Sequence, residues 1–430
     1  MRALPATDKR SWKNQAEIHG QLLGSFGSCR HASWYFLPWH RAYLHCFEEI
    51  VRELSGDPNF ALPYWDWSTQ VTLPKQFWGS NNPLSNPARP DQPGSGRKPG
   101  LTETTAIAQT DLDRFVGQTV VSQILGIPDF ETFAGAAVDN LGDESGSQGR
   151  LENAPHNFIH RWVSGDMASG GSPYDPIFWL HHCNVDRLWT EWVRKHPRGT
   201  PSDTGWLDTV FRGDYKFYDR QGNALETLTV RQMLDPGNLG YRYDGRDRAA
   251  FPVLNAAFIR PKIFEGPSNN FRVENGVMQS SLTADQFQAD RLQGIAEGVD
   301  ESAPRQTIRM KLSGVKVPKM QDVLIQVHVN CQKISPDLPI TDPSYVGSST
   351  FFSHEGHGGH NGDSMSASFL FSLNQTFARL YADRPLSSTE PLKVVVLVKP
   401  LFSGGAKIEP GQIQELAPQQ VRIDIVQAPN

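Results

Sequence analysis

The stretch that decides the fold runs from Leu151 to Trp192: LENAPHNFIHRWVSGDMASGGSPYDPIFWLHHCNVDRLWTEW. It contains two histidines four residues apart, His156 and His160, which on a helix project from one face about one turn apart. After a break rich in glycine and serine, an apolar and aromatic run carries two more, His181 and His182. The pattern predicts two helices whose imidazoles can face one metal ion.

A carboxylate follows the histidine pair at helical spacing. Asp186 lies four residues after His182, where a carboxylate can accept the outer ring N–H of a ligating imidazole. A single histidine is more often a core or surface residue than a ligand. Paired helical spacing with a carboxylate one turn away favours the metal site and assigns Asp186 a supporting role behind His182.

A second set of three histidines precedes this stretch. His19 lies in a predicted helix over residues 15–23, and SCRHASWYFLPWHRAYLHCFEEIVREL contains His31 and His40. The second half of that segment has the periodicity of an amphipathic helix, and Gly56 lies in the turn that ends it. His40 falls in the first turn of this helix.

Six histidines in two sets of three restrict the choice of metal. Imidazole ligands suit copper, zinc, iron and nickel, but di-iron bundles use glutamates and catalytic zinc sites often include a carboxylate or thiolate. Two sets without an obvious carboxylate ligand favour a pair of copper ions that could bind O₂ between them. The residues alone leave two outcomes open: reversible O₂ carriage or oxidation of a substrate.

Composition and charge exclude several classes of partner. The 430 residues suffice for two or three domains, and 38% of them are hydrophobic, enough for a sizeable core. The net charge of −5 comes without a long basic run, so we expect no nucleic acid partner. We expect no membrane span, because no run of about 20 apolar residues occurs. The sequence does not indicate an oligomeric state.

The N-terminus and the cysteines bear on location. The first fifteen residues lack the apolar core of a signal peptide. Four cysteines scattered over a chain of this length do not suggest a disulfide framework. A cytoplasmic location is therefore expected if Met1 is the native start.

The character of the chain changes after about residue 244. From about residue 303 onward, short alternating or β-branched runs are separated by Pro/Gly turns, which is typical of an antiparallel sandwich. The predicted strands are Thr307–Leu312, Val323–Val329, Ser366–Leu373, Val394–Val398 and Val421–Val426.

Two segments resemble the copper-site signatures of the type-3 copper proteins, the family of tyrosinases, catechol oxidases and molluscan-type haemocyanins. HASWYFLPWHRAYLHCFEE has the form H-x4-F-L-x-W-H-R-x2-L-x3-E, and DPIFWLHHCNVD has the form D-P-x-F-W-x2-H-x3-D. ENAPHNFIHRW resembles the segment that supplies two ligands of the second copper. The opening ALPATDKRSWKNQAEIH resembles plant and related bacterial polyphenol oxidases.

The resemblance implies an α+β fold with three regions. These are a mainly helical dicopper domain with a four-helix bundle core (residues 1–245), a linker (246–303) and an antiparallel β-sandwich that shields the active site (304–430). Leu239–Tyr243 (LGYRY) resembles the paired-tyrosine motif that closes the helical domain. In relatives an N-terminal segment meets this motif, so we expect the N-terminus to be truncated.

The resemblance also implies the metal ligands. It assigns the first copper to His19, His31 and His40. It assigns the second copper to His156, His160 and His182. His181 is then a packing or hydrogen-bonding neighbour.

Two further positions match features that vary among relatives. Cys29 precedes His31 by two residues, and in some members this Cys-x-His forms a thioether to the ligand's ring; a free buried thiol is the alternative. Ser169 lies thirteen residues before His182, where plant relatives place a bulky aromatic gate. A small side chain there implies an open site.

Glu152, Asn157 and Arg161 match residues that act on the substrate in relatives. The matching Glu and Asn hold a water that is thought to take the proton of a monophenol, and the residue at Arg161 tunes the orientation of the ring. The alternatives are a first-turn helix charge for Glu152 and a solvent-facing Asn157.

The C-terminal domain of relatives can insert a side chain into the site as a substrate mimic. Phe351, Phe352 and Tyr345, in a loop-like stretch between predicted strands, are the candidates. HEGHGGH (residues 354–360) could bind a metal transiently, but a loop with solvated histidines is the favoured interpretation.

The function implied is the copper-dependent oxidation of phenols by O₂. It comprises oxidation of o-diphenols to o-quinones and ortho-hydroxylation of monophenols. A haemocyanin-like reversible O₂ carrier and an o-aminophenol oxidase are the alternatives that the sequence leaves open.

Overall fold

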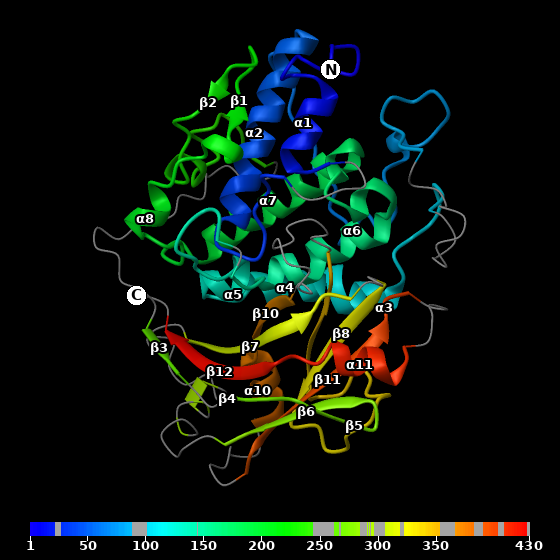
Figure 1. Cartoon of the computed structure of the whole chain (residues 1–430), viewed down its shortest axis with the longest axis vertical. Helices are drawn as coiled ribbons and strands as arrows, with labels where there is room; N and C mark the ends of the chain where they lie inside the picture. Colours follow the sequence, from blue (N-terminus) through cyan, green and yellow to red (C-terminus); the bar gives the residue numbers. More distant parts are fainter. Residues whose placement is uncertain are drawn as a thin grey trace.

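Helices occupy the N-terminal half of the chain and strands the C-terminal half (Figure 1). The computed structural model describes residues 1–21, 27–87, 101–143, 145–243, 262–265, 268–283, 290, 292, 294–295, 306–318, 322–352, 366–381, 390–402 and 408–427. The predicted α+β class, with a helical part followed by an antiparallel sandwich, is confirmed.

Two long helices form the centre of the helical part. In α2 (Phe36–Ser55) the apolar side chains recur at helical spacing and are buried, whereas α7 (Ile177–Lys195) is buried along nearly its whole length. Gly56 ends α2 with a φ of 71°, a left-handed conformation that glycine adopts without steric cost, and its N–H bonds Arg52 O. Phe47 of α2 stacks on Trp179 of α7, with ring centroids 3.4 Å apart, so the two helices are held in direct contact.

Shorter helices surround this pair. Those that matter for the site are α1 (Trp12–His19), which begins at the side-chain cap Ser11, and α6 (Asn157–Val163) with the π-helical turn η3 (Glu152–His156) before it. The others are η1 (Lys75–Phe77), α3 (Gln109–Asp111), η2 (Leu112–Val116), α4 (Gln118–Leu125), α5 (Phe130–Ala134), η4 (Gly165–Ala168), η5 (Ser172–Tyr174), α8 (Thr204–Leu207), η6 (Gly213–Tyr215) and η7 (Arg231–Met233). A small hairpin joins β1 (Phe217–Tyr218) to β2 (Ala224–Leu225).

The C-terminal half forms two antiparallel sheets packed face to face. One has the order β10-β7-β12-β3 with β4 also paired to β12, and the other has the order β5-β6-β11-β8-β9. Their strands are β3 (Lys262–Phe264), β4 (Ser268–Asn269), β5 (Arg272–Glu274), β6 (Val277–Leu282), β7 (Gln306–Lys316), β8 (Val323–Val329), β9 (Tyr345–Thr350), β10 (Ser366–Ser372), β11 (Leu392–Pro400) and β12 (Gln420–Gln427). Two helices, α10 (Asn374–Tyr381) and α11 (Pro410–Glu415), complete this part. All five predicted strands are present.

Two expectations about this half need correction. The segment 246–303, predicted as a linker, contains β3 to β6. β3 and β4 pair with β12 in one sheet, whereas β6 pairs with β11 and β5 in the other. Residues 345–350, predicted to be loop-like, form β9 at the edge of the second sheet. The histidine-rich segment 354–360 lies outside the described residues.

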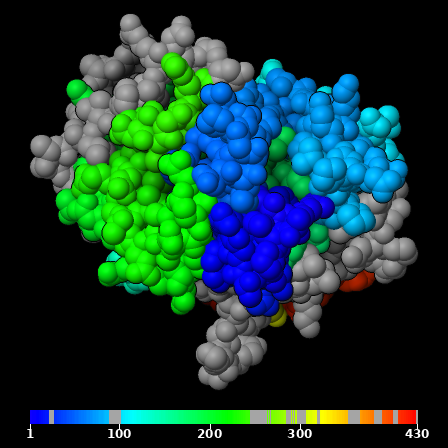
Figure 2. All heavy atoms as spheres, turned by 90° about the horizontal axis from the view of Figure 1, so that it is seen from above, coloured from blue at the N-terminus to red at the C-terminus, as the bar shows by residue number. Residues whose placement is uncertain are grey.

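The sandwich contacts the helical part through backbone as well as side chains. Gln148 N–H donates to Ser368 O, and Leu370 N–H donates to Gln148 O, both at 2.9 Å. This short bridge continues β10 into the helical part. From above, the visible face is formed mostly by helical-part segments coloured blue and green (Figure 2). In Figure 1 the sandwich lies below the helical part, so it covers the opposite side.

Candidate dicopper site

Six buried histidines converge from four helices and one loop. His19 is the last residue of α1, His40 lies early in α2, His156 ends η3, and His160 and His182 belong to α6 and α7. His31 comes from the loop before α2, and all six side chains are at most 8% exposed. Pro155 lies inside η3. Proline has no N–H for the regular helical ladder, and π-turns of this kind occur frequently at functional sites.

Backbone carbonyls fix the orientation of three of these rings. The Nδ1–H groups of His19 and His40 donate to Gly170 O and Phe36 O, each at 2.8 Å. His160 Nδ1–H donates to Met167 O at 2.6 Å. A neutral imidazole that donates from Nδ1 keeps a lone pair on Nε2, which is the arrangement of a metal-ligating histidine.

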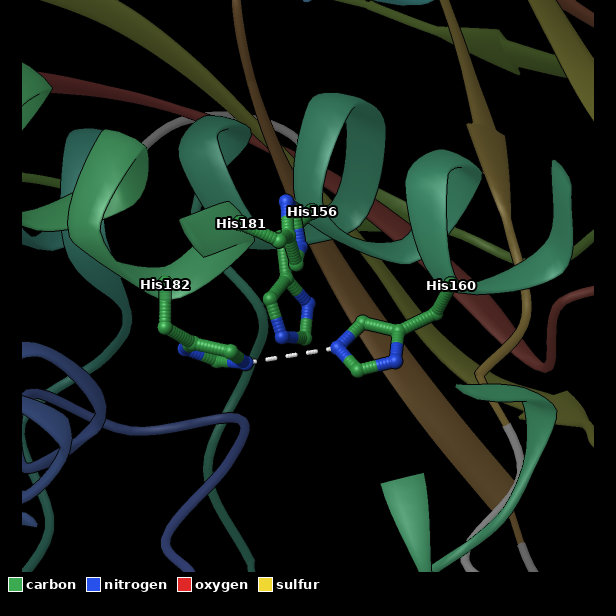
Figure 3. Close-up of side chains that lie close together, drawn as sticks. All are labelled: His156, His160, His181 and His182. Atoms are coloured by element: carbon green, nitrogen blue, oxygen red, sulfur yellow. Dashed lines mark hydrogen bonds between the residues drawn. The ribbon is translucent and has the colours of Figure 1, made fainter. Parts of the chain in front are cut away.

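The two sets of three histidines face each other. His40 of the first set stacks on His182 of the second, with ring centroids 4.5 Å apart and an interplanar angle of 12°. His31 and His156 lie 5.5 Å apart across the same gap. Within the second set, Nε2 of His160 and Nε2 of His182 approach to 3.3 Å (Figure 3). A donor set of neutral imidazoles at these separations fits two copper ions side by side.

Burial keeps these histidines neutral. It lowers the pKa of His19 to about 3 and holds the pKa values of His40, His160 and His182 well below 6.5; the neighbouring histidines add to the effect. Only the neutral ring can ligate a metal ion, because the ligating nitrogen must be unprotonated. The site therefore remains ready to bind metal well into the acidic range.

His181 also lies within this cluster. Ligand atoms of His156, His160, His181 and His182 all lie within 4.8 Å of one another. His181 differs from the others in its partner, because its Nδ1 accepts from Trp67 Nε1–H at 3.2 Å. This hydrogen bond is in line with the predicted role of a neighbour rather than a ligand.

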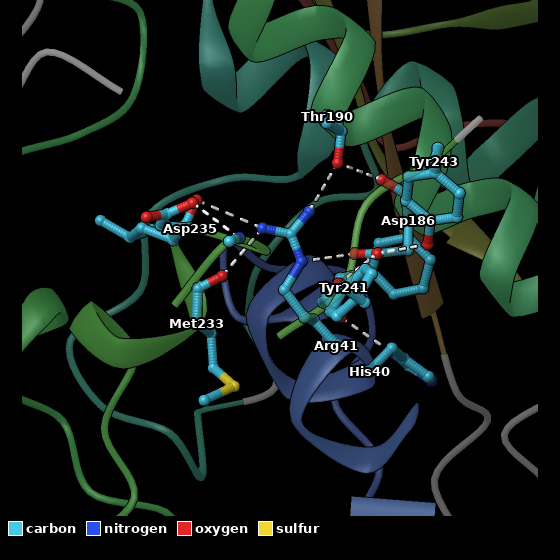
Figure 4. A network of polar contacts seen from close by, with 11 residues as sticks. His40, Arg41, Asp186, Thr190, Met233, Asp235, Tyr241 and Tyr243 are labelled. Carbon is cyan, nitrogen blue, oxygen red and sulfur yellow. Dashed lines mark hydrogen bonds and ion pairs between the residues drawn. The ribbon is translucent and has the colours of Figure 1, made fainter. Parts of the chain in front are cut away.

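Asp186 does not support His182, so this expectation is wrong. Its Oδ1 lies 2.5 Å from Arg41 Nε, and its Oδ2 accepts from the hydroxyls of Tyr241 and Tyr243, each at 2.6 Å (Figure 4). Among the described residues, His182 Nδ1 has no hydrogen-bond partner. The carboxylate of Asp186 therefore binds Arg41 of α2 and two tyrosines at the end of the helical part instead of the imidazole.

Arg41 joins the two histidine helices. Its guanidinium donates to Met233 O at 2.8 Å and to Thr190 Oγ1 at 3.1 Å, and lies 3.8 Å from the ring centre of Trp189. Burial by itself lowers the pKa of Arg41, but the charge and hydrogen bond of Asp186, together with Tyr241 and Tyr243, outweigh burial and the pKa is raised. Sequence reasoning missed this role, although Arg41 directly follows His40 in the W-H-R motif.

Glu152 lies fully buried beside the first histidine set. Both carboxylate oxygens accept from Ala32 N–H, at 2.9 and 3.0 Å, and Ala32 adjoins His31. Burial raises the pKa of Glu152 to about 8. A carboxyl with this pKa exchanges a proton near neutral pH, as a general base or acid in an active site does.

Asn157 uses its whole amide within the protein. Its Oδ1 accepts from His156 Nδ1–H at 2.9 Å, and its Nδ2 donates to Gln148 Oε1 at 2.9 Å and to Thr350 O at 3.1 Å. Asn157 is fully buried, so the solvent-facing alternative is wrong, whereas its role in holding a water remains a prediction. It orients a predicted copper ligand and contacts the end of β9.

Arg161 faces the sandwich. Its guanidinium, 1% exposed, forms an ion pair with Asp322 just before β8. The residue expected to orient a substrate is therefore covered by the C-terminal part.

The remaining two predicted positions lie on loops near the histidines. Ser169 Oγ donates to Asp166 O at 3.0 Å and accepts from Gly171 N–H, so this side chain stabilises its own loop. Cys29 is buried and forms no disulfide within the described residues, and its sulfur lies within 4.8 Å of ring nitrogens of His19 and His31. That proximity places it where a thioether to His31 would form.

One aromatic side chain of the sandwich reaches the histidines. Phe352 stacks on His160, with ring centroids 4.1 Å apart, and lies 5.8 Å from His31 and 5.7 Å from His156. It thus contacts both histidine sets. The other two candidates do not: Phe351 packs against Phe369 in the sandwich, and Tyr345 bonds Ser348.

Comparison with known proteins agrees with this geometry. The chain matches the common central domain of tyrosinase over residues 9–195 and the polyphenol oxidase middle domain over residues 201–256. Tyrosinase HcTyr1 of Hahella sp. is 29% identical over 298 residues, 61% of this chain and 61% of its own. Polyphenol oxidase of Vitis vinifera is 33% identical over 279 residues, 56% of this chain and 43% of its own. The chain thus spans about half the length of these curated relatives.

Solved structures share the whole fold. A latent aurone synthase (polyphenol oxidase) superimposes with a TM-score of 0.69 at 22% identity, covering 100% of this chain and 86% of that one. Latent apple tyrosinase superimposes with a TM-score of 0.63 at 23% identity, covering 99% and 91%. The likeness includes the sandwich as well as the helical part.

The comparisons also correct the expected location. The polyphenol oxidases of Ipomoea batatas, Prunus armeniaca and Vitis vinifera are named as chloroplastic proteins, which contradicts a cytoplasmic location inferred from the sequence. No helix within the described ranges combines the length and apolar character that crossing a membrane requires.

The two family matches together cover more than half of the chain, and its clusters of buried histidines fit the copper site of such proteins. The chain therefore belongs to the tyrosinase and polyphenol oxidase family of type-3 copper proteins.

Proposed function

We propose that this protein oxidises o-diphenols to o-quinones with O₂ at a dinuclear copper site. The observation that carries the proposal is the position of Phe352, an aromatic ring stacked on His160 and in contact with His31 and His156. A phenol ring of the same size fits the same place. In the balanced reaction, two diphenols each lose two electrons and two protons, and one O₂ becomes two waters.

The chain's own groups prepare this site. Two copper ions held by the six histidines would supply O₂ binding and the acceptance of electrons from a phenolate. His19, His40 and His160 are held by carbonyls in the tautomer that presents Nε2, and Asn157 orients His156. The buried Arg41–Asp186 pair sets the relative position of α2 and α7, on which the distance between the two sets depends.

The second part of the proposal is that the sandwich shields the site. We divide the chain into a catalytic part up to about residue 245 and a shielding part from 262 onward, since β3 already belongs to the sheets. Phe352 occupies the position of a substrate ring, and Arg161 is bound by Asp322. A phenol can reach the histidines only when Phe352 leaves, so activity requires displacement of the sandwich.

Glu152 favours a further activity, the ortho-hydroxylation of monophenols. A monophenol must lose a proton before its oxygen can bind copper, and a phenol has a pKa near 10. Glu152, with a pKa raised to about 8, stands beside His31 through its bond to Ala32. It can take the phenol proton, directly or through a water.

The alternatives gain no support from the comparisons. The relatives and structures described above are named tyrosinases, polyphenol oxidases and an aurone synthase. A reversible O₂ carrier would show oxygen-dependent absorption without turning over catechol. An o-aminophenol oxidase would consume o-aminophenol in preference to catechol.

The test is made on the copper-loaded full chain before and after limited proteolysis between the two parts. We expect about two copper ions per chain, slow quinone formation from catechol before cleavage and faster formation afterwards. Tyramine should be hydroxylated after cleavage, and Glu152→Gln should lower that rate more than the rate on catechol. One copper per chain, or no quinone from cleaved protein, contradicts the oxidase proposal; equal losses on both substrates contradict the role of Glu152.

A further inference from the structure

A cavity of about 490 Å³ lies where the helical part meets the sandwich. The helical side contributes residues of α4 together with Arg150, and the sandwich side contributes Tyr345 at the start of β9 and Arg379 on α10. None of the lining residues is one of the histidines described above. The cavity is therefore separate from the dicopper site.

Arg150 brings a buried positive charge to this cavity. The side chain is 7% exposed, and among the described residues all its hydrogen bonds leave from Nη1. These bonds go to Asn153 Oδ1 at 2.7 Å, Ser348 O at 3.2 Å and Ser349 Oγ at 3.3 Å, which are neutral acceptors. Nε and Nη2 are left for another acceptor. Burial lowers the pKa of Arg150 to about 10, as expected for a cation without a carboxylate neighbour.

Two other buried arginines have a carboxylate partner, whereas buried Arg30 donates to the carbonyl oxygens of Ser28 and Leu141. Arg41 pairs with Asp186, and Arg161 pairs with Asp322. A buried charge without such a partner costs several kcal/mol. An anion from solution that binds Arg150 would therefore offset the cost of burying its positive charge, because no carboxylate of the described residues does so.

Arg379 adds a second guanidinium from the other side. It donates to Pro343 O at 3.3 Å, Tyr345 O at 2.5 Å and Thr376 Oγ1 at 3.1 Å, again all neutral oxygens. No hydrogen bond leaves from its Nη1 among the described residues.

The two carboxylates in the lining are engaged elsewhere. Asp113 accepts from Gln109 Nε2 at 2.7 Å, and Asp342 accepts from the N–H and hydroxyl of Ser344 at 2.9 and 2.5 Å. Neither forms an ion pair with Arg150 or Arg379 within the described part of the chain.

We propose that this interface cavity binds a small oxyanion, a phosphate or carboxylate group, between Arg150 and Arg379. Guanidinium groups present paired N–H donors that match the oxygens of such anions. The cavity volume admits a small organic molecule that carries the anionic group. Because one arginine belongs to each part of the molecule, the ligand joins the helical part to the sandwich.

The ligand also acts on β9. Arg150 bonds Ser348 and Ser349 in this strand, and Arg379 bonds Tyr345 at its start. β9 ends at Thr350, two residues before Phe352. An oxyanion that immobilises both arginines holds β9 in place and keeps Phe352 against the histidines; the effect on activity rests on the proposed function, whereas binding does not.

Binding is tested by calorimetry on the copper-loaded full chain at constant ionic strength. Inorganic phosphate and succinate are titrated separately, so that the two arms distinguish a phosphate from a carboxylate ligand. We expect one site per chain, weakened at least about tenfold by Arg379→Gln, because each charge-assisted hydrogen bond contributes about 1.5–3 kcal/mol. Arg150→Lys, which keeps the charge but loses the fork, should weaken it as well.

Arg212→Gln is the matched control, because it removes an exposed positive charge outside the cavity. Arg212→Gln should bind the anion with the affinity of wild type. If the anion bound at copper instead, wild type and all the variants would bind it with equal affinity. Hydrogen–deuterium exchange of residues 345–352 should slow several-fold in wild type with the bound anion. Equal binding by wild type, Arg379→Gln and Arg150→Lys overturns the site, and unchanged exchange overturns the action on β9. Neither readout depends on oxidase activity, so failure of the proposed function would be seen separately.

Discussion

At the scale of single residues, the hydrogen-bond partner of one ring nitrogen predicts whether a buried histidine is a metal ligand or a neighbour of one. His160 and His182 present Nε2 atoms 3.3 Å apart toward the same point, whereas His181 receives a hydrogen bond from Trp67 on Nδ1. Both adjacent histidines are fully buried. Burial alone therefore does not distinguish the two histidines, but the hydrogen bond that His181 accepts predicts that His182 is the ligand.

This difference predicts the outcome of two adjacent substitutions. His182→Ala removes a proposed ligand of the second copper, so copper should fall from about two ions per chain to about one. The near-ultraviolet absorption band that appears on oxygenation should disappear with it. His181→Ala is the matched control and should retain both ions. If His182→Ala kept two copper ions and His181→Ala lost one, His181 would be the ligand and His182 its neighbour.

Glu152 predicts a pH dependence of stability in the copper-free protein. Its pKa is raised to about 8 in the folded state from about 4.5, so between these values the folded protein binds more protons than the unfolded one. Stability therefore falls as pH rises from about 4.5 to about 8, by a few kcal/mol at most. In Glu152→Gln this contribution is absent. The free energy of unfolding in urea should therefore increase for the variant, relative to wild type, as the pH rises toward 8. A constant difference across that range would contradict the buried, raised carboxyl.

The buried histidines have the opposite effect on the pH dependence of stability. Burial depresses the pKa values of His19, His40, His160 and His182, so their contribution is complete above about pH 6.5 and is lost as the pH falls below it. Each contributes a slope of up to about 1.4 kcal/mol per pH unit. Copper-free protein should thus unfold in mild acid, and titration of its urea midpoint from pH 7 to pH 4 should show a steep decrease. A flat profile would mean that the rings are already charged or exposed.

At the scale of elements, the sequence predicts best those helices and strands that a local periodicity of apolar or functional residues is sufficient to identify. The four-residue spacing of His156 and His160 and the amphipathic pattern of α2 correspond to helices, and β8 begins and ends at the predicted residues. β9 was missed because YVGSST lacks an alternating apolar pattern. Its polar residues are nevertheless buried, since Arg150, Asn153 and Asn157 of the helical part bond to them. A strand whose burial comes from another domain carries no hydrophobic signal of its own.

The error at Asp186 has a related cause. Its spacing from His182 matches helical support of a ligand, but local spacing contains no information on Arg41 or on Tyr241, which lie 145 and 55 residues away in sequence. A guanidinium and two hydroxyls occupy the carboxylate, and the imidazole cannot compete for it. The ligand set could be assigned from the sequence with the family resemblance, whereas the charge network around it depends on the tertiary fold.

The end of β9 gives a further prediction. Phe351 and Phe352 are consecutive and equally buried, but Phe351 packs on Phe369 within the sandwich and Phe352 on His160. Phe352→Ala should raise the rate of catechol oxidation by uncleaved protein several-fold, because the ring that occupies the substrate position is gone. Phe351→Ala should mainly lower stability, by about 3–5 kcal/mol as for other buried aromatic truncations. Initial quinone formation and thermal unfolding of both variants provide the measurement; equal rates in the two would contradict the role of Phe352.

At the scale of the whole molecule, polar contacts help to join the two parts. Gln148 extends β10 through backbone hydrogen bonds, Arg150 and Asn153 bond β9, and Arg161 pairs with Asp322. The interface is therefore partly polar, although Leu324, Phe352 and Leu401 of the sandwich also pack into the core of the helical part. It suits a shield that must be displaced, because polar groups can exchange their partners for water at modest net cost.

The Arg161–Asp322 pair is where this idea can be tested without changing the active site. Arg161 is 1% exposed and Asp322 is 24% exposed, so Asp322→Asn leaves a buried guanidinium without its full counter-charge. The cost, discounted for the partial exposure of Asp322, is about 1–3 kcal/mol and falls on the docked state alone. A larger fraction of chains should then have the sandwich displaced.

We expect catechol oxidation by uncleaved Asp322→Asn to rise several-fold toward the rate of the cleaved protein, with the rate after cleavage unchanged. Asp337→Asn, which alters an exposed carboxylate in the same sandwich, is the matched control and should behave as wild type. Because Arg161 itself is retained and residue 322 is removed with the sandwich, the cleaved variant and the cleaved wild type have the same catalytic part and should oxidise catechol at equal rates. A variant with wild-type activity before cleavage would show that this ion pair does not hold the sandwich in place.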